Sequence, residues 1–339
     1  MLAGDRGIDG TAAVHPLDAS GDAGRARGFG RRETEEAKQM SEARFNVVAQ
    51  SIAHGASADI EAKGGALAAS AGLAAILGGG RGCQLRMDSA ASAIWIPLRG
   101  RIQIGHGGDS LLQAGEARVT EADAPGQAVG RGNSLWVVLL GKPTVWRQVM
   151  QERLGVAPMH AWLFPARHAT DLDLKRRAIA LARAIATGEG IEIAAENVVE
   201  RIVAMQGGFA EAIARCPGRT YAQRRQVFVR LQRVRNYLTA NCHLEIDNDE
   251  LARMANYSPS HFIRAFGSVY EETPHAFLIR QRLARARRLL RVSPLAINEI
   301  ALESGFENAS AFSRLFRQRF GITAGTARRN VGALHAVAG

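Results

Sequence analysis

The chain has 339 residues, of which 47% are hydrophobic and 22% are charged, and its formal net charge is +11. This composition supplies ordinary cores for two or three domains, and no apolar stretch reaches the roughly 20 residues that a membrane-spanning helix needs. Three cysteines, Cys83, Cys216 and Cys242, lie far apart in the sequence and match no metal-ligand spacing, which indicates a reduced protein.

The N-terminal segment 1–40 is rich in Gly, Ala, Asp and Arg and has few large apolar side chains. Such a segment cannot bury a core, so we expect a disordered tail. It also lacks the apolar core of a signal peptide. Periodic apolar sequence begins at Phe45, which makes Met40 an alternative to Met1 as the translation start.

Residues 41–157 alternate between apolar and polar side chains, with turn-forming residues at short intervals. Residues 94–96 are followed by an expected turn at 99–100, and 134–140 form an expected buried strand. The three glycines 78–80 predict a hairpin or flexible loop, because no Gly-Lys-Ser/Thr follows to make a phosphate loop. Several short strands at close spacing predict a small β-barrel or sandwich.

Residues 158–218 change to a helical pattern. Apolar side chains three and four residues apart predict one helix over 172–185 and another over 195–205. Glycines at 188–190 and 207–208 mark the breaks. Apolar stripes of this kind form either a core or a contact between helices of two chains, so homodimerisation through them is one of two interpretations.

Residues 219–329 contain one short pattern twice. Phe262, Arg264 and Phe266 recur 50 residues later as Phe312, Arg314 and Phe316. In each copy the two Phe side chains are four residues apart and share a buried helix face, while the Arg points away. Ser258 before Pro259 and, in the second copy, Asn308 are expected N-caps, and Gly305 permits a turn with positive φ. Helix, tight turn and helix make a helix-turn-helix unit, whose second helix fits a DNA major groove.

An amphipathic helix is predicted between the two units. Its apolar stripe consists of Ala276, Ile279, Leu283, Ala286 and Leu290, with arginines on its other sides. It begins near Thr273 and stops before Ser293, a length of roughly 25 Å at 1.5 Å per residue. Such a helix can hold two recognition helices about one DNA turn, roughly 34 Å, apart. A further helix over 223–238 opens this domain.

The positive charge is concentrated in the same domain. From Arg219 to the end there are 19 Arg, no Lys and 9 Asp or Glu, a net charge of +10. Such a distribution is typical of a surface that neutralises phosphates, and a solvated basic helix face is the alternative that charge alone leaves open.

These motifs resemble the DNA-binding domain of AraC/XylS-type bacterial transcription regulators. The resemblance covers 221–329 and rests on the segments 251–252, 258–260, 262–266, 282–290, 300–301, 305–306 and 312–321. It implies two helix-turn-helix units bridged by a long helix. After Gly321 the family usually has a proline and a Tyr-Arg pair, where this chain has Ala324 and Ala327-Arg328.

The family also implies an architecture for the rest of the chain. Its N-terminal domain is commonly a cupin-like barrel that binds an effector, dimerises, or does both. We therefore expect an α+β protein with a tail at 1–40, a cupin-like β-barrel at 41–157 and a helical linker at 158–218. The DNA-binding domain at 219–329 is then followed by a C-terminal tail at 330–339.

The family's matching positions imply which side chains meet DNA. Those expected to face base edges are Ser260, Ile263, Arg264, Ser310, Ala311 and Arg314. Those expected to bind phosphates are His261, Arg280, Arg287, Arg288, Ser313 and Arg317. Arginine can donate two hydrogen bonds to guanine, whereas isoleucine and alanine offer only apolar contact, for instance to a thymine methyl. The alternative for Arg264 and Arg314 is phosphate binding along the groove wall.

The sequence thus predicts a sequence-specific transcription regulator, an activator rather than a repressor, that acts on promoter DNA in the cytoplasm, on the nucleoid. Its expected partners are double-stranded DNA, RNA polymerase, an unknown small-molecule effector and a second copy of the chain, and not a membrane. An architectural DNA binder without sequence preference is one alternative.

The other alternative is a β-barrel enzyme with a DNA-binding tail. It would need a ligand or catalytic cluster in 45–140, where His54 and His106 are isolated and no H-x-H pair occurs. We therefore predict no enzyme activity, catalytic residue, metal or cofactor. Cys216 has no neighbouring His, so we expect a structural thiol and not an alkyl-accepting one.

Overall fold

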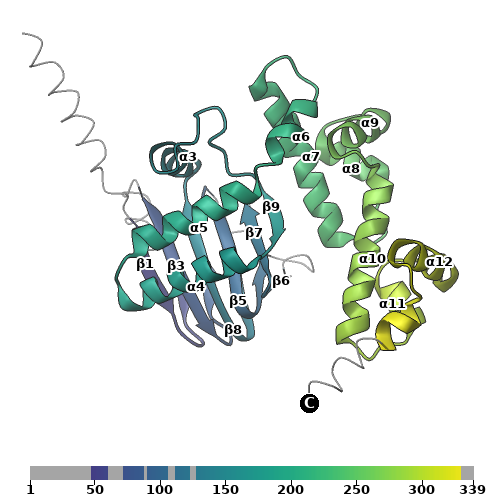
Figure 1. Ribbon diagram of the computed structural model, residues 1–339, viewed down its shortest axis with the longest axis horizontal. Helices are drawn as coiled ribbons and strands as arrows, with labels where there is room; N and C mark the ends of the chain where they lie inside the picture. The colour runs from purple at the N-terminus through teal and green to yellow at the C-terminus, as the bar shows by residue number, and fades with distance from the viewer. Residues whose placement is uncertain (1–46, 60–71, 88–89, 106–110, 123–126, 330–339) are drawn as a thin grey trace, which may run out of the picture. The chain divides into compact units, whose positions relative to one another are not determined.

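The computed structural model describes residues 47–59, 72–87, 90–105, 111–122 and 127–329 (Figure 1). The predictions for the tail 1–40, the start at Met40, His106 and the tail 330–339 concern residues outside these ranges. An N-terminal sheet with helices is followed by a helical C-terminal part, in agreement with the expected mixture of α and β structure.

The N-terminal part is built on one sheet. Its strands are β1 (Val47–Ile52), β2 (Ser57–Asp59), β3 (Leu73–Gly80), β4 (Gln84–Arg86), β5 (Ser92–Ile104), β6 (Leu111–Gln113), β7 (Glu116–Thr120), β8 (Gln127–Gly141) and β9 (Ala166–Ala169). The main path has the order β1-β3-β8-β5-β7-β9, β4 pairs with β2 and β8, and β6 pairs with β5. Strands β1 and β3 are parallel, and so are β2 and β4. Among the described strands no pairing joins β1 to β9, so the sheet is not closed into the expected barrel.

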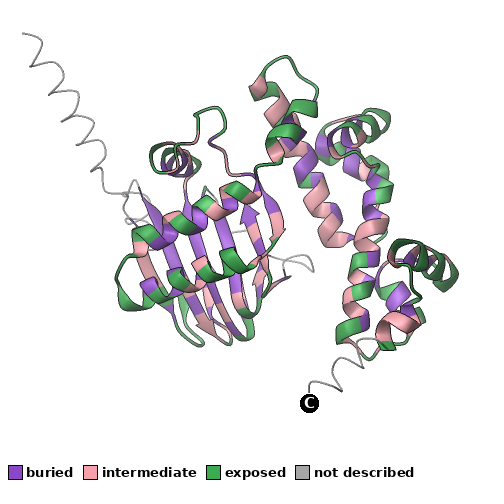
Figure 2. Cartoon of the chain, viewed as in Figure 1, coloured by how far each residue is buried: buried purple, intermediate pink, exposed green. Residues whose placement is uncertain are grey.

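The central strands are buried on both faces, which explains their nearly continuous apolar sequence (Figure 2). On β8, Val137 and Leu139 enter a core shared with α3 (Pro143–Glu152), α4 (Leu172–Thr187) and α5 (Ile191–Met205). The alternate residues Trp136 and Val138 enter a second core on the other face. There the ring centroids of Trp136 and Trp95 are 6.1 Å apart, and both side chains are fully buried.

Two glycine-containing segments that predicted turns or loops lie within strands. Strand β5 continues through residues 99–100, and its register with β8 is irregular on both sides of Arg99. At this irregularity Gly100 adopts φ +71° and lies close to the Ser134 backbone. Residues 78–80 belong to β3 and pair with residues 134–136 of β8, and position 78 must be glycine because a Cβ there would lie 2.1 Å from the Trp136 ring. Both predictions were wrong because contacts with β8, remote in sequence, determine these conformations.

The middle segment contains the two predicted helices and two further elements. Helices α4 and α5 confirm the expected pair, and the turn between them lies at the expected glycines 188–190. Helix α3 was not predicted, and neither was strand β9, which pairs with β7. Strand β9 has only four residues, and its pairing partner is about 50 residues away in the sequence.

The C-terminal part is helical, as predicted. Its helices are α6 (Phe209–Arg215), α7 (Tyr221–Asn241), α8 (Asn248–Ala255), α9 (Pro259–Tyr270), α10 (Pro274–Val292), α11 (Ile297–Glu303) and α12 (Ala309–Phe320). The pairs α8–α9 and α11–α12 are the two helix-turn-helix units, and α10 is the connecting helix between them.

Each unit has its own core, and α10 contributes to both. Phe277 and Leu278 enter the first core, whereas Leu283, Ala286 and Leu290 enter the second. The predicted stripe was wrong at Ala276, which is exposed, because the buried face of α10 rotates toward Phe277 at its N-terminal end.

The first core extends beyond the predicted start of the domain at 219. Ile213 of α6 lies in it, and so does Phe164, whose ring is 5.2 Å from that of Phe228 on α7. Gln206 fixes this segment by a side-chain amide that donates to the Phe164 carbonyl and accepts from its N–H. Residues of the predicted linker therefore help to support the first helix-turn-helix unit.

Candidate nucleic-acid interface

The first unit is organised by a tight turn and two buried rings. Asn256 ends α8 with φ +56°, and Ser258 precedes α9 in extended conformation with Pro259 at the first turn. The Ser258 side chain makes no cap hydrogen bond, so the proline and the backbone geometry carry this helix start. Phe262 and Phe266 are fully buried, which directs the opposite face of α9 to solvent.

The second unit repeats this design with different caps. Gly305 has φ +89°, as the turn requires, and Asn308 Oδ1 accepts a hydrogen bond of 2.7 Å from the Ala311 N–H at the start of α12. Phe312 and Phe316 are fully buried. The predicted N-cap and positive φ are therefore confirmed. The segment that follows α12 packs against the core of the second unit through Ala324, which is buried.

The residues predicted to face bases lie on the solvent-facing sides of α9 and α12. Ser260, Ile263, Arg264, Ser310 and Arg314 are exposed, and Ala311 is half-buried. Ile263 is 37% exposed, so its apolar side chain is accessible for contact with a base. Arg264 Nε donates a long bond of 3.4 Å to the Ser260 carbonyl of its own helix. The guanidinium of Arg314 has no hydrogen bond or ion pair to any residue that the structure describes.

The arginines of α10 differ in whether their guanidinium groups already form ion pairs or hydrogen bonds within the protein. Arg280 is ion-paired with Glu272 at 2.6 Å. Arg282 donates to the carbonyls of Cys242 and Leu244, and Arg285 donates to that of Glu303. Arg287 is exposed and lies 5.1 Å from the centroid of the Phe320 ring.

Arg288 and His261 complete the set predicted to bind phosphates outside α12. Arg288 is half-buried, and burial lowers the pKa of its guanidinium while Glu116 acts in the opposite sense. His261 is exposed, with its ring centroid 4.4 Å from that of Tyr257. Arg287 is thus the α10 member of the set whose charge is most available to a ligand from solvent.

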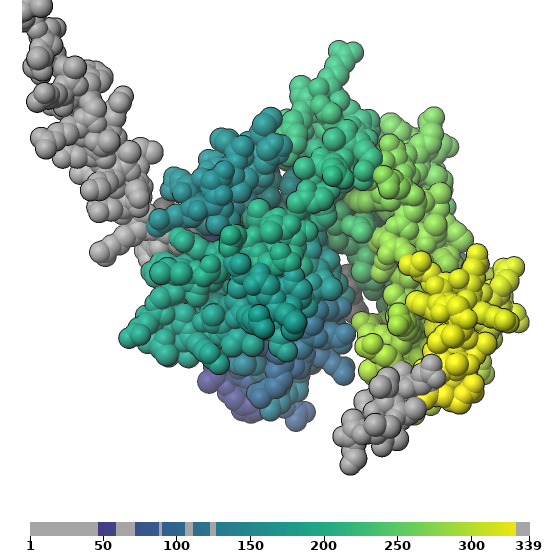
Figure 3. Space-filling model, viewed as in Figure 1, coloured from purple at the N-terminus to yellow at the C-terminus, as the bar shows by residue number. Residues whose placement is uncertain are grey.

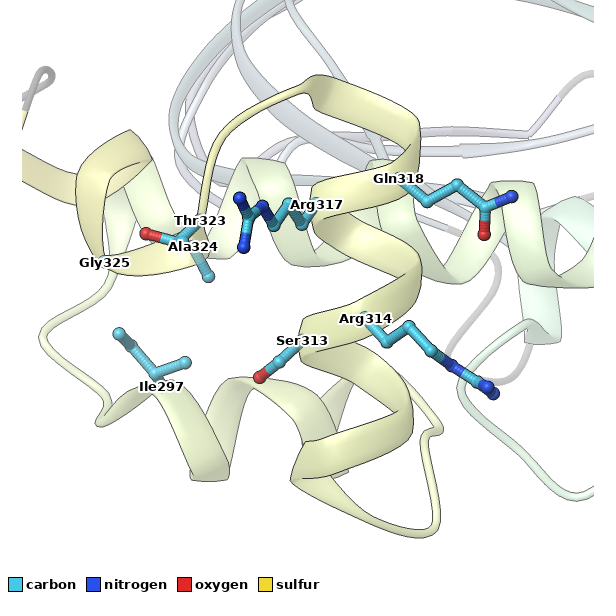
Figure 4. A pocket seen from close by; sticks show the side chains of 8 residues that line it. All are labelled: Ile297, Ser313, Arg314, Arg317, Gln318, Thr323, Ala324 and Gly325. Carbon is cyan, nitrogen blue, oxygen red and sulfur yellow. The ribbon is translucent and has the colours of Figure 1, made fainter.

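A pocket of about 850 Å³ lies beside α12 (Figure 4). It is lined by Ile297, Ser313, Arg314, Arg317, Gln318, Thr323, Ala324 and Gly325. Arg317 points toward Thr323 and Ser313 points toward Ile297, whereas Arg314 and Gln318 leave α12 on the opposite side. The structure thus brings the two predicted phosphate ligands of α12 together and separates them from Arg314.

Gln318 and Thr323 were missed by the sequence reasoning. Gln318 follows Arg314 by four residues, so helical spacing alone places both on one face. Thr323 is the N-cap of the short helical segment after α12, where its hydroxyl accepts from the Thr326 N–H at 3.2 Å. The C-terminal residues of this unit form the yellow part of the surface in Figure 3.

A metal site, a membrane span and a reactive thiol each have requirements that can be compared with the described ranges. No three His, Cys, Asp or Glu side chains there form a group that could hold a metal ion. Within the same residues no helix combines the length and the apolar character needed to cross a bilayer. Cys216 is buried, its thiol donates to the Ala212 carbonyl, and burial raises its pKa to about 12, so little reactive thiolate forms near neutral pH.

Comparison with known proteins places the similarity in the same helices. A helix-turn-helix domain family model matches residues 251–330. The transcriptional regulator GlxA of Rhizobium meliloti (strain 1021) is 40% identical over 91 residues, which are 26% of this chain and 27% of that protein. The virulence regulon transcriptional activator VirF of Yersinia enterocolitica is 39% identical over 67 residues, 20% of this chain and 25% of that protein. The chain thus spans about a quarter of the length of the curated relatives that it matches.

One solved structure is also similar to part of this chain. The DNA-binding domain of AdpA, a global transcriptional factor crystallised with a target DNA, is 31% identical, covers 31% of this chain and 94% of that chain, and has a TM-score of 0.30. The matched family model, the sequence identity to curated regulators and the two helix-turn-helix units coincide in this chain. Residues 251–330 are therefore a helix-turn-helix domain, and they resemble the DNA-binding domain of AraC-type transcription regulators.

Proposed function

We propose that this protein is a sequence-specific regulator of transcription that places α9 and α12 in consecutive major grooves of a promoter. The observation that carries the proposal is the continuity of α10, a helix of 19 residues whose buried side chains contribute to the cores of both units. At 1.5 Å per residue α10 is about 28 Å long, which is comparable with one turn of DNA. A single helix shared by two cores fixes the spacing of the recognition helices.

Base recognition in this proposal depends on the exposed face of each recognition helix. Arg264 and Arg314 occupy equivalent positions, and each can donate two hydrogen bonds to O6 and N7 of guanine. Ser260 and Ser310 can bond to several bases, while Ile263 and Ala311 favour a thymine methyl. Phosphate contacts by His261, Arg287, Arg288, Ser313 and Arg317 then hold the protein in register. Arg280 is less available for such a contact, because its Nε and Nη2 groups already donate to Glu272.

We further propose that the bound protein activates transcription by contact with RNA polymerase. VirF, which is similar to this chain over 67 residues, is described as a transcriptional activator. The similarity lies in the DNA-binding helices, so a reporter assay with the chain's own promoter site is the direct test. Expression should rise when the protein is supplied, and a fall would identify a repressor.

The N-terminal sheet is proposed to act as a cupin-like sensor of a small-molecule effector. The core around Trp95 and Trp136 is filled, but a pocket of about 570 Å³ lies where β5, the turn before β7 and the start of α4 meet. Its volume is in the range of ligand pockets, and Pro97, Leu172 and Lys175 offer it apolar and cationic groups.

Helices α4 and α5 are proposed to pair two copies of the chain. Leu172 on α4 is 72% exposed and Ile193 on α5 is 68% exposed, although both are large apolar side chains. Pairing would remove this apolar surface from water, which favours association. Sedimentation of the full chain should therefore give a dimer, and the double variant Leu172→Glu with Ile193→Glu should give a monomer.

Selection of bound duplexes from a random pool tests the proposed function. The full chain at about 0.15 M salt should enrich one motif with two boxes about one helical turn apart. A matched selection with the Arg264→Ala, Arg314→Ala double variant should lose the enriched bases but keep weak binding to any duplex. Enrichment of no motif by the native chain would contradict the proposal and favour an architectural binder, because specific binders prefer their site by about 10³ or more.

A further inference from the structure

Two arginines from separate helices lie over the ring of Trp162, in the segment between α3 and β9. The guanidinium carbon of Arg225, on α7, is 3.3 Å from the ring centroid, and that of Arg147, on α3, is 4.3 Å from it. The two carbons therefore cannot be farther apart than the sum of these distances. Attraction between a cation and an aromatic face holds each group in place. The fold thus brings two positive charges to one indole.

These two charges have no anionic partner within the described residues. Neither guanidinium has an ion pair there, and Arg147 Nε is buried without a hydrogen-bond acceptor. Helix α3 carries one carboxylate, Glu152, and it accepts a bond of 3.1 Å from Gln148 instead. Charged groups that are partly removed from water are normally paired. Arg147 and Arg225 can therefore bind an external anion without losing a partner in the chain.

The environment of Arg225 is also positive. Burial lowers the pKa of its guanidinium, the phenol of Tyr221 acts in the opposite sense, and the charge of Arg147 lowers the pKa further. An anion bound between the arginines would relieve the repulsion of these two like charges.

Tyr221 and His160 lie beside the arginine pair. Their ring centroids are 5.3 Å apart in edge contact, and His160 is exposed. The Tyr221 hydroxyl has no hydrogen-bond partner in the described part of the chain. Burial raises its pKa while Arg225 acts in the opposite sense, so the hydroxyl keeps its proton and can donate. The cluster thus offers several donors, and none of its side chains is a carboxylate.

We propose that Arg147, Trp162 and Arg225 form a binding site for a small dianion, either a dicarboxylate or a phosphate ester. A guanidinium donates in a planar fork that matches both kinds of oxyanion, with N···O distances of about 2.8 Å. Two such forks favour a ligand with two negative charges, because each can then bind its own pair of oxygens. The indole already orients both forks, so little side-chain freedom is lost on binding.

The site is separate from the proposed DNA interface and from the proposed effector pocket. None of its side chains lies on α9, α10 or α12, and none lines the pocket of about 570 Å³. Both arginines are half-buried, so each presents only part of its guanidinium to solvent, which a small ligand can reach. A bound dianion contacts α3 and α7 together, and it stabilises the native chain because the unfolded chain lacks the site.

Intrinsic fluorescence tests the site directly. Trp162 is half-buried, whereas the other three tryptophans, Trp95, Trp136 and Trp146, are fully buried. Succinate and inorganic phosphate are titrated separately into the full chain at about pH 8 and at constant ionic strength, which keeps general screening unchanged. At least one dianion should change the emission in a saturable manner, and the tighter of the two identifies a carboxylate or a phosphate ligand.

Singly charged analogues measure the need for two charges. Monomethyl succinate and dimethyl phosphate should bind at least about tenfold more weakly than the corresponding dianions, the size expected for a lost charged hydrogen bond. This comparison uses only the native chain, so it holds even if a variant fails to fold.

Matched variants connect the signal to the arginines. Arg147→Gln and Arg225→Gln should each weaken binding at least about tenfold. Arg176→Gln removes the same charge from α4, where the exposed Arg176 has no ion pair with a described residue, so it should bind like the native chain. Trp162→Phe keeps an aromatic face, so it should lose the fluorescence change but still release heat on binding in calorimetry.

Three results would overturn the inference. The first is a native chain that shows neither a saturable signal nor a heat of binding with either dianion. The second is equal affinity for the dianions and their singly charged analogues. The third is the same loss of affinity in Arg176→Gln as in Arg225→Gln, because the effect would then be one of net charge. No DNA is present in these titrations, so each of these results leaves the proposed function unaffected.

Discussion

Arg314 is the side chain on which base discrimination depends most in this account. It is exposed on α12 and has no bonding partner within the described residues, so no internal contact is lost when it binds a base. The Arg314→Ala variant should lose about 1 to 3 kcal/mol of binding free energy on the selected site and accept other bases at one base pair. Binding assays on single-base variants of the duplex measure this. Unchanged base preference would assign Arg314 to phosphate.

His168 gives the fold a pH dependence. Burial, followed by the charge of Arg235, lowers its pKa from 6.5 to about 4. Between these pH values the unfolded chain binds more protons at this residue than the folded chain. The contribution of His168 to the free energy of unfolding is therefore fully present above about pH 6.5 and is lost as the pH falls toward 4. Thermal melting of His168→Gln should show a flatter dependence in this window than the native chain, and parallel curves would be inconsistent with the lowered pKa.

At the scale of the element, two glycines with positive φ are expected to differ in how strictly they are required. A Cβ at Gly305 would lie 2.8 Å from the Cys242 carbonyl oxygen and 2.9 Å from Arg282 Nε, whereas Gly321 has no neighbour within 4 Å. Gly321→Ala should cost about 1 kcal/mol, the strain of the left-handed conformation. Gly305→Ala should cost clearly more, because the turn of the second unit must also move. Urea unfolding measures both, and equal losses would contradict the packing at Gly305.

Helix α10 offers a matched pair of arginines. Arg287 is exposed, and Arg280 is ion-paired with Glu272. Each phosphate contact contributes about 0.9 to the slope of log affinity against log salt, so Arg287→Ala should lower that slope by about one. Arg280→Ala should lower it less, because the charge of Arg280 is already partly neutralised by its ion pair with Glu272. A larger effect for Arg280 would show that its ion pair opens on DNA.

At the scale of the whole molecule, the helical C-terminal part was predictable because its signals are local. Phenylalanines four residues apart, Pro259 after Ser258, and Asn308 three residues before the amide that it caps all act within one or two helical turns. The candidate base-reading face could be predicted for the same reason. The segment 323–325 could not be linked to α12 in this way, because the chain must turn after Gly321 before they meet.

The N-terminal sheet was only partly predictable. The stretch 134–140 predicted the C-terminal half of β8. The bulge in β5 and the pairing of β9, in contrast, depend on partners far along the chain. The same limit applies to the availability of positive charge. The sequence gives the number of arginines, but it does not show that Arg282 and Arg285 donate to backbone carbonyls. Long-range contacts, and not local propensity, determine these features.

The measurement that tests the central claim most directly is the dependence of affinity on box spacing. Five base pairs are inserted between the two boxes of the selected duplex, which moves the second box to the opposite side of the DNA. Because α10 holds both units through their cores, the full chain cannot follow, and its affinity should fall by at least about 10²-fold toward the non-specific level. Unchanged affinity for the lengthened site would contradict the claim that two recognition helices on one rigid connector read consecutive major grooves.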